Sequence, residues 1–479
     1  MTENFEIKGQ WFLPDNPKSR VSGTLFYDTN KGFYLELFGD FNESQIIPVS
    51  DILEFDFILG LTSDSKEITL YKSFITKRSG IRLVQNQEAG IPFSIFSVNY
   101  VFEGAHFSNE SELNFDRLTT EIIDFDEWVA ISGFKNDFDI EKRLDLRRKN
   151  EFECKYKLPD TITFNLSDQL EGRFEFSLSN SDHFVYTKKV TLEQKIKFSL
   201  NYKTEQKYNV LLTDLFKFQS FLMLALYEKT LPYNIILSNN KLTKDYGPAG
   251  VVKRQIKLFI HSSLEFKSLN KQKHFMDMLF SYRDIEEDFP DIISKWYKKY
   301  DDLESSFNLL IEQFFNDKRF SENTFLNLAQ CIESFHAHTR NKPKIPKDEY
   351  NDMKKHILST VDSKYHSWLK DQFNFGNNLN LHARLEEIID FCSCDMISQL
   401  ISDKNSFIKD VKNSRNYYTH YSNDLKKKAL KGTDLFYLSQ KLKIIIVCSF
   451  LLEIGFDKTK LNQLLEDKKY KFFYGLLKL

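Results

Sequence analysis

Cysteine is scarce in this sequence, which has 5 cysteines among 479 residues. So few cysteines in so long a chain form no disulfide framework, which fits a protein of a reducing compartment. Cys392 and Cys394 are close enough to be half of a thiolate metal site, but no second pair lies at the spacing of a zinc finger. Two buried helix cysteines are the simpler interpretation, and we expect no metal and no other cofactor.

Long hydrophobic runs are also missing. The longest uncharged apolar stretches are residues 218–227 and 444–452, both well short of the roughly 18 residues that span a bilayer. Residues 1–6 have neither the basic nor the apolar segment of a signal peptide. We therefore expect a cytoplasmic protein with no membrane partner.

Neither sign of charge is in excess, with 66 Lys plus Arg against 68 Asp plus Glu. The chain as a whole generates no strong field that attracts nucleic acid, so any RNA binding must be local. No Walker loop and no dinucleotide-binding glycine pattern occurs, so hydrolysis of nucleoside triphosphates is not expected. His336, His338 and His366 lack the carboxylate spacing of a His-Glu-x-x-His metal motif.

The chain is too long for one hydrophobic core, and its length predicts two to four domains. Short β-rich runs separated by Gly, Asn and Ser turns fill its first part, which predicts a sandwich-like or barrel region. One helix, at about 213–227, interrupts them. The predicted strands are at 23–28, 33–39, 68–71, 81–84, 93–102, 113–115, 161–166, 172–178, 195–200, 234–237 and 255–260.

From about residue 291 onward the apolar residues recur almost entirely with the period of a helix. The acidic turn 284–290 before this point is the best candidate for a linker. The predicted helices are at 291–316, 321–338, 347–372, 380–391, 396–423, 433–454 and 457–469.

The predicted fold class is therefore α+β and multidomain, with a β-rich N-terminal region followed by an all-α helical bundle. We divide the chain into a β-rich domain at 1–135, a second β-rich domain with one helix at 136–283, a helical linker at 284–318, and a helical domain at 319–479.

The run RNYYTH at residues 415–420 carries the side chains of most chemical interest. On a helical wheel Val411 and Tyr418 belong to the stripe that faces the core. Asn416 and His420 lie at about 140° and 180° from Val411, so both face away from the core, one turn apart. The helix should therefore present these polar groups on an open face.

Cleavage of RNA phosphodiesters is the chemistry that suits this run. His420 can accept the proton of a 2′-hydroxyl or return one to the departing 5′-oxygen. Arg415 stays charged and can hold the phosphate in two places as negative charge builds on it. Asn416 can orient the imidazole or donate to a phosphate oxygen. The nucleophile lies within the substrate, so the scheme needs no metal.

A single histidine on one helix is awkward for the acid and base roles at once. Two copies that met across a two-fold axis would bring two arginines and two histidines to one phosphate. We therefore expect a homodimer formed through this domain. The motif alone is short, and an exposed Arg and His on an amphipathic helix is the alternative that it leaves open.

The motif in its setting resembles the Arg-Asn-x-x-x-His signature of HEPN ribonucleases, which also lies on a late helix and precedes a long apolar helix. Residues 325–336 resemble the first long helix of that domain, and residues 381–387 resemble a middle one. More narrowly, the chain resembles ApeA-type anti-phage defence proteins, which join a β-rich N-terminal domain to a HEPN domain. Residues 9–14, 23–28 and Trp128 carry the looser N-terminal part of this resemblance.

The resemblance implies a metal-independent endoribonuclease that pairs as a dimer and acts in abortive infection by cutting host or phage RNA, such as tRNA. It implies that Arg415 and His420 are catalytic and that Asn416 is the polar residue after the arginine. Glu333, on the first long helix, is our addition, as a carboxylate that can hold Arg415 in place. Tyr421, next to the motif, is a further supporting candidate.

Four lysines follow the motif and are candidates for binding RNA phosphates, although a charge run is usually a solvated face. They are Lys426, Lys427, Lys428 and Lys431. We expect the N-terminal region to act as a sensor or regulator that responds to a phage-derived trigger. The alternative from another class is a non-catalytic HEPN module that binds a nucleotide or a partner through the same face. The intact Arg and His of the motif favour the enzyme.

Overall fold

The computed structural model describes residues 4–41, 54–79, 93–135, 154–180, 190–245, 247–261, 273–315, 321–340, 342–468 and 474–477. Contacts along the chain divide it into two compact units. The β-rich unit comprises Met1–Gln219 and Thr230–Phe275, and the helical unit comprises Ser220–Lys229 and Met276–Leu479. A β-rich N-terminal region followed by a helical C-terminal region is the fold class expected from the sequence, and it is confirmed.

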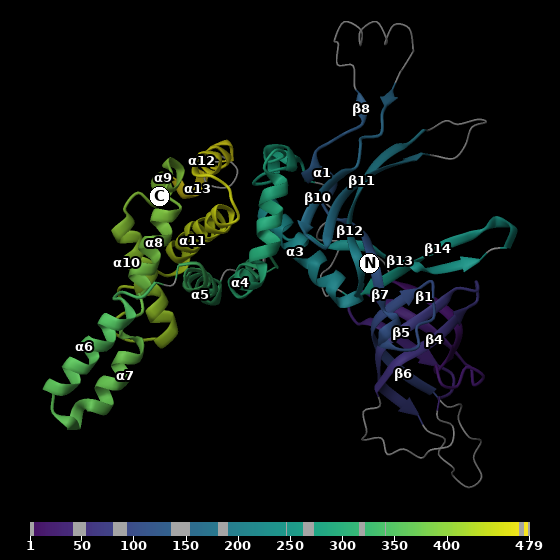
Figure 1. Cartoon of the computed structure of the whole chain (residues 1–479), viewed down its shortest axis with the longest axis horizontal. Coiled ribbons are helices and arrows are strands. Elements are labelled where there is room, and N and C mark those ends of the chain that lie inside the picture. Colours follow the sequence, from purple (N-terminus) through teal and green to yellow (C-terminus); the bar gives the residue numbers. More distant parts are fainter. Residues whose placement is uncertain are drawn as a thin grey trace, which may run out of the picture. The chain divides into compact units, whose positions relative to one another are not determined.

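The first six strands close into a barrel (Figure 1). Their order is β6-β3-β2-β1-β4-β5, and β5 pairs back with β6 to complete the ring. The short strands of the sequence are compatible with a sandwich or a barrel, and strands β1 to β6 form a barrel. The bounds are β1 (Phe5–Phe12), β2 (Val21–Asp28), β3 (Gly32–Leu37), β4 (Glu54–Thr62), β5 (Glu67–Ser79) and β6 (Phe93–Glu103).

Alternate residues of the barrel strands point inward, as a half-buried strand requires. On β2, for example, Val21, Gly23, Leu25 and Tyr27 are buried while the residues that alternate with them are more exposed. Trp11 on β1 is fully buried and lies opposite Gly60 on β4. A Cβ atom at position 60 would collide with the Trp11 ring, so the barrel interior requires glycine there.

The remaining long strands extend the same sheet beyond the barrel, in the order β6-β14-β13-β7-β12-β11-β10. The expected boundary at residue 135 does not divide the sheet, because β7 on one side of it pairs with β12 and β13 on the other. The strand expected at 81–84 lies outside the described residues. The bounds are β7 (Asn114–Ile122), β10 (Ile162–Ser167), β11 (Leu170–Asn180), β12 (Leu192–Lys207), β13 (Pro232–Asp245) and β14 (Val251–Ile260), with a separate short ladder of β8 (Phe134–Lys135) and β9 (Lys155–Tyr156).

One face of this extension packs against the first turns of α3 (Tyr208–Leu226). Phe198 on β12 stacks on Phe218 of α3 with ring centroids 3.7 Å apart, and both rings are fully buried. Because successive strand residues point to opposite faces, the neighbours of Phe198 on β12 point to the other side of the sheet. That other side is polar.

Two helices, α3 and α11 (Gly432–Glu453), are long and apolar enough by composition to cross a membrane. Most of the apolar window of each is buried inside the protein, as in the core helices of folded domains. The two longest uncharged runs of the sequence, 218–227 and 444–452, fall in these two helices apart from Tyr227, and each helix is longer than its run because it also contains charged residues.

Helix α5 is the centre of the helical unit and packs against α4, α8, α10 and α11. The stretch expected as a linker is mostly α4, whose Trp296 and Phe307 are fully buried and contact Phe450 of α11. Its apolar residues recur at helical spacing, so α4 is a core helix of this unit rather than a spacer. The bounds are α4 (Phe289–Phe315), α5 (Glu322–Thr339), α6 (Lys347–Thr360), α7 (His366–Gly376), α8 (Leu381–Phe391), α9 (Asp395–Ile401), α10 (Lys404–His420), α12 (Lys458–Asp467) and α13 (Tyr474–Leu477).

Two of the expected helices are each broken in two, so those predictions are wrong. The range 347–372 holds α6 and α7, which lie side by side in Figure 1 and are separated by a short 3-10 turn capped by Asp362. The range 396–423 holds α9 and α10, because Ser402 adopts a φ of 53° and Asp403 caps the start of α10. The helical spacing of apolar residues continues through both breaks, so this spacing does not reveal where the helices end.

Candidate functional site

Helix α10 has well-defined ends, and these determine how it presents the motif. At its start, the carboxylate of Asp403 accepts hydrogen bonds from the amides of Asn405 and Ser406, at 3.0 and 3.1 Å. At its end, Tyr421 adopts a left-handed φ of 49° and its amide donates to the Tyr417 carbonyl. The motif thus occupies the last two turns of the helix. The buried face of the helix is formed by Phe407, Ile408, Val411, Ser414 and Tyr418.

Arg415 forms an ion pair with Glu333 of α5. Its Nε donates to Glu333 Oε1 at 3.1 Å, and its Nη2 approaches Glu333 Oε2 at 3.5 Å. The side chains are 31% and 26% exposed, so the pair lies at the surface of the helical unit but is partly shielded from solvent. A guanidinium has five N–H groups in a fixed fork. Glu333 engages two of these N–H groups and Asn416 a third, so the remaining N–H groups are available for an anion.

Asn416 and His420 lie on the open side of α10. Asn416 is half-buried, and its Oδ1 accepts from Arg415 Nη1 at 3.4 Å, a long hydrogen bond. His420 is exposed, and within the described residues no hydrogen bond or ion pair engages its ring. Both imidazole nitrogens are thus accessible for proton transfer to a substrate.

The segment after α10 is held to the helix by two hydrogen bonds to Leu430. Tyr418 Oη donates to the Leu430 carbonyl at 2.9 Å, and the Leu430 amide donates to Ser414 Oγ at 3.0 Å. Burial raises the pKa of Tyr418, so its hydroxyl remains a donor at physiological pH. These two bonds keep the lysine-bearing segment next to the motif.

Three of the four predicted lysines line an open hollow of about 640 Å³. They are Lys426, Lys427 and Lys431. Lys431 also places its ammonium 5.6 Å from the centre of the Tyr417 ring, within the range of a cation–π interaction. Lys428 is exposed but does not line the hollow.

A second cavity, of about 330 Å³, lies beside the Arg415–Glu333 pair. Besides Arg415, Asn416 and Glu333, its lining includes the cationic or titratable side chains of Arg384, Lys412 and His382. Arg384 is fixed by its own bonds, because its Nη1 donates to the Glu333 carbonyl at 3.1 Å. Three permanent cations therefore face a single carboxylate, an excess of positive charge that suits a phosphate group.

Two family models match the chain. The model described as ApeA N-terminal domain 1 matches residues 6–296, and the model described as Apea-like HEPN matches residues 326–460. The chain belongs to the ApeA family. The resemblance to ApeA-type proteins with a C-terminal HEPN domain is thus confirmed, and this domain suggests a nuclease-type defence protein. Neither the curated proteins nor the solved structures contain a match.

The candidate residues of this ApeA-family protein all lie within the HEPN match. The structure brings Arg415, Asn416 and Glu333 into one hydrogen-bonded group. It puts His420 one turn further along the same open face, not hydrogen-bonded to that group within the described residues. Tyr421 is exposed and contacts the Tyr417 ring at a centroid distance of 5.5 Å.

Sequence reasoning missed His382 and Lys412 of the ApeA HEPN domain. Lys412 precedes Arg415 by three residues, which is one helical turn, so its nearness was readable from the spacing. His382 and Arg384 are on α8, and no spacing in the sequence relates them to α10. Only the tertiary packing of α8 against α10 and α5 brings them to the cavity.

His336, one turn after Glu333 on α5, serves a different purpose in the ApeA HEPN domain. It is almost fully buried, and its Nε2 lies 2.8 Å from Glu387 Oε2 on α8. Burial lowers the pKa of His336 despite this carboxylate, and Arg384 adds to the lowering. The ring is therefore neutral at physiological pH and donates to Glu387, which ties α5 to α8. Among the described residues no group of three or more His, Cys, Asp or Glu side chains is arranged to hold a metal ion.

Proposed function

We propose that this protein is a metal-independent endoribonuclease that acts in anti-phage defence by abortive infection, cutting RNA such as tRNA. The single observation that carries the proposal is Arg415, fixed by Glu333 next to Asn416, with the accessible ring of His420 one turn away. A rigidly held arginine beside a free imidazole is what cleavage of a phosphodiester by its own 2′-hydroxyl requires.

Each side chain has a role in that reaction. His420 accepts the proton of the 2′-hydroxyl as its oxygen attacks the phosphorus, and the bond to the 5′-oxygen breaks. The products are a 2′,3′-cyclic phosphate and a 5′-hydroxyl, whose oxygen takes up a proton. Arg415 stabilises the negative charge that builds on the phosphoryl oxygens, and Asn416 donates to one of them. The nucleophile belongs to the substrate, so the reaction needs no metal-bound water.

A homodimer through the HEPN domain completes the site. One histidine cannot at the same moment accept the 2′ proton and donate to the 5′-oxygen, whereas a two-fold axis near α10 supplies a second His420 from the partner copy. The open face of α10, the exposed Tyr421 and the exposed His420 are the surface that such a pairing uses.

RNA binding is local, because the net charge of the chain is close to zero. Lys426, Lys427 and Lys431 around their hollow, and Lys412 with Arg384 around the smaller cavity, are the cations that hold the phosphates on either side of the cut. The β-rich region acts as sensor or regulator and restrains cleavage until a phage-derived trigger arrives.

The test is cleavage of total RNA from uninfected and phage-infected cells, in EDTA, by full-length wild type, Arg415→Ala and His420→Ala. His356→Ala, which removes an exposed histidine on α6, is the matched control. Wild type and control should cut and leave 2′,3′-cyclic ends, and the two site variants should not. Equal cleavage by all four proteins would show that the active site is not on α10. No cleavage of either RNA by wild type would favour the non-catalytic binding module.

A further inference from the structure

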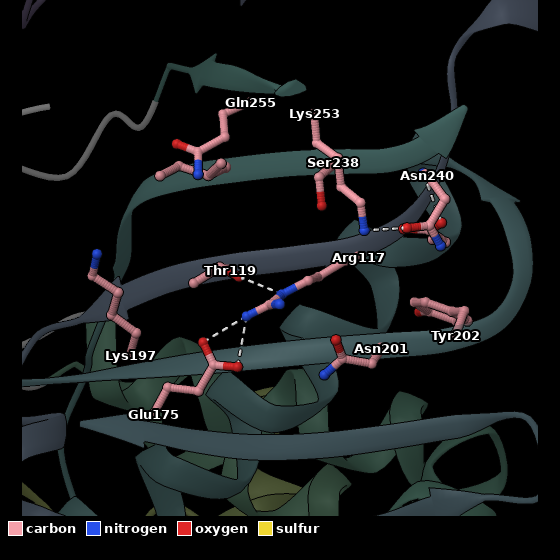
Figure 2. A pocket seen from close by; sticks show the side chains of 12 residues that line it. Arg117, Thr119, Glu175, Lys197, Asn201, Tyr202, Ser238, Asn240, Lys253 and Gln255 are labelled. Carbon is pink, nitrogen blue, oxygen red and sulfur yellow. Dashed lines mark hydrogen bonds and ion pairs between the residues drawn. The ribbon is translucent and has the colours of Figure 1, made fainter. Parts of the chain in front are cut away.

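The polar side of the open sheet in the β-rich unit is hollowed into a cavity of about 460 Å³ (Figure 2). Its 12 lining residues come from five neighbouring strands, β11, β12, β7, β13 and β14. Ile236 is the single aliphatic side chain among them. Ordinary ligand pockets are mostly apolar. A cavity with this lining selects a ligand that is hydrophilic along its whole length.

Strand register brings the hydrogen-bonding groups of the cavity into line. Arg117 on β7 lies opposite Asn201 on β12 and Ser238 on β13, and Ser238 lies opposite Gln255 on β14. Residues paired in this way point to the same face of the sheet. Four adjacent strands therefore present a row of one guanidinium, two amides and a hydroxyl to the cavity.

Arg117 is the fixed centre of this row. Its Nη2 donates to both carboxylate oxygens of Glu175 at 2.6 Å, and its Nε donates to Thr119 Oγ1 at 3.2 Å. The hydroxyl of Thr119 is in turn 3.0 Å from Ser199 Oγ, which is fully buried. A charged group with so many partners has little rotational freedom, so the floor of the cavity is preorganised.

Several hydrogen-bond donors in the cavity can accept a further partner. The Nδ2 atom of Asn201 is buried and has no hydrogen-bond partner among the described residues. A buried amide left in this state costs free energy, which a ligand oxygen would recover. Lys197 forms no ion pair within the described part of the chain, and Lys253 donates only to the neutral amide oxygen of Asn240, at 2.5 Å.

The balance of charge favours an anion. Three cations, Arg117, Lys197 and Lys253, line the cavity with two carboxylates, Asp116 and Glu175. Glu175 is neutralised by Arg117, and Asp116 accepts the backbone amide of Asn240 at 3.0 Å. The lining therefore carries a net charge of one positive, and its two lysines come from strands on either side of β7.

We propose that this cavity binds a small phosphate ester rich in hydroxyl or amide groups, the chemical class that includes nucleotides and sugar phosphates. Lys197 and Lys253 lie at opposite sides of the cavity (Figure 2), so the phosphate binds at one of them, and Asn201 Nδ2 with the row around Arg117 binds the polar remainder. A volume of about 460 Å³ lies within the range of small-molecule sites. The proposal concerns the β-rich unit alone and does not depend on the nuclease activity proposed above.

Calorimetric titration of the full-length protein tests the proposal with four probes: AMP, ribose 5-phosphate, adenosine and inorganic phosphate. We expect at least one of the two esters to bind with a dissociation constant below about 1 mM, and adenosine and inorganic phosphate to bind about tenfold more weakly or not at all. Binding of AMP alone identifies a nucleotide site, and binding of both esters identifies a sugar phosphate as the recognised part.

Variants locate the binding in the cavity. The double variant Lys197→Ala/Lys253→Ala should weaken ester binding by about tenfold or more. Asn201→Asp should have a similar effect, because it replaces an amide donor by a carboxylate with the same sign of charge as the phosphate. Lys203→Ala removes an exposed lysine from the same strand and should leave the affinity unchanged. Arg415→Ala should also bind normally, which separates this proposal from the nuclease site. No saturable binding of either ester at about 1 mM, or equal affinity in all variants, would show that the hollow is only a solvated sheet face.

Discussion

Arg415 of α10 and Glu333 of α5 lie 82 positions apart in the sequence and form a two-point ion pair, with an Nε to Oε1 distance of 3.1 Å. The pair leaves one edge of the guanidinium facing the cavity that Lys412 and His382 also line. In the proposed reaction Glu333 would therefore act through Arg415, as a positioning residue that does not touch the substrate.

Replacement of Glu333 should therefore lower the rate of RNA cleavage without abolishing it. We expect kcat to fall roughly tenfold in Glu333→Gln and further in Glu333→Ala, because glutamine can still accept one hydrogen bond from Arg415. KM should change little. The measurement is single-turnover cleavage of a defined RNA, with Glu349→Gln, an exposed position on α6, as control. Wild-type kcat in Glu333→Ala would contradict the positioning role.

The lysines of the hollow should contribute to RNA binding rather than to the chemical step. The triple variant Lys426→Ala/Lys427→Ala/Lys431→Ala should raise KM roughly tenfold, leave kcat near the wild-type value and flatten the dependence of binding on salt. Lys428→Ala is the matched control, because that lysine is exposed but lies outside the lining. Electrophoretic mobility shifts over a salt series measure the effect. An equal loss in the control would mean that only the overall charge of the segment matters.

A dimer should be the active species. Specific activity should rise with protein concentration through the dissociation constant of the dimer and then level off, because a monomer offers one histidine for two proton transfers. Analytical ultracentrifugation of the same dilution series gives the fraction of dimer. Full specific activity at concentrations where the protein sediments as a monomer would overturn the two-copy site.

Burial of His336 makes the stability of the helical unit depend on pH. Its pKa is below the ordinary value of 6.5 in the folded protein, so above pH 6.5 the ring is neutral whether the chain is folded or unfolded. As the pH falls through 6.5 toward the folded pKa, His336 binds a proton in the unfolded chain but stays neutral in the folded chain. The free energy of unfolding therefore decreases. Urea midpoints at pH 7.5 and pH 5.5 should therefore differ more for wild type than for His336→Gln.

The exposed His356 supplies the comparison for that measurement, because its replacement by glutamine should leave the wild-type difference between the two midpoints unchanged. A pH dependence in His336→Gln as steep as that of wild type would assign the effect to other groups.

The sequence predicted strands and helices well where the spacing of apolar residues depends on a single element. The alternation of strands and the helical period of residues 404–420 are properties of a few neighbouring residues, so the open face with Asn416 and His420 was visible before any tertiary contact. The breaks at Asp362 and at Ser402 were not visible, because capping and a positive φ leave the apolar spacing unchanged.

The cavity beside Arg415 shows the limit of such reasoning. Lys412 was within reach, since it lies one turn from Arg415 on the same helix. His382 and Arg384 were not, because α8 comes next to α10 only in the tertiary fold, where the two helices contact each other and α5. The polar cavity around Arg117 is a stronger case, since it gathers side chains from five strands that are scattered along the chain.

The sequence by itself determined the family, the order of a β-rich and a helical region, and the presence of Arg415, Asn416 and His420 on one helix, with Asn416 and His420 on its open face. These depend on residue identity and on periods of two and about 3.6 residues, which are local. The tertiary structure alone decided that β5 closes on β6, that Glu333 meets Arg415 and that Lys197 and Lys253 face one hollow. Such contacts join segments far apart in the chain, and the physical reason is that burial of apolar faces sets which segments become neighbours.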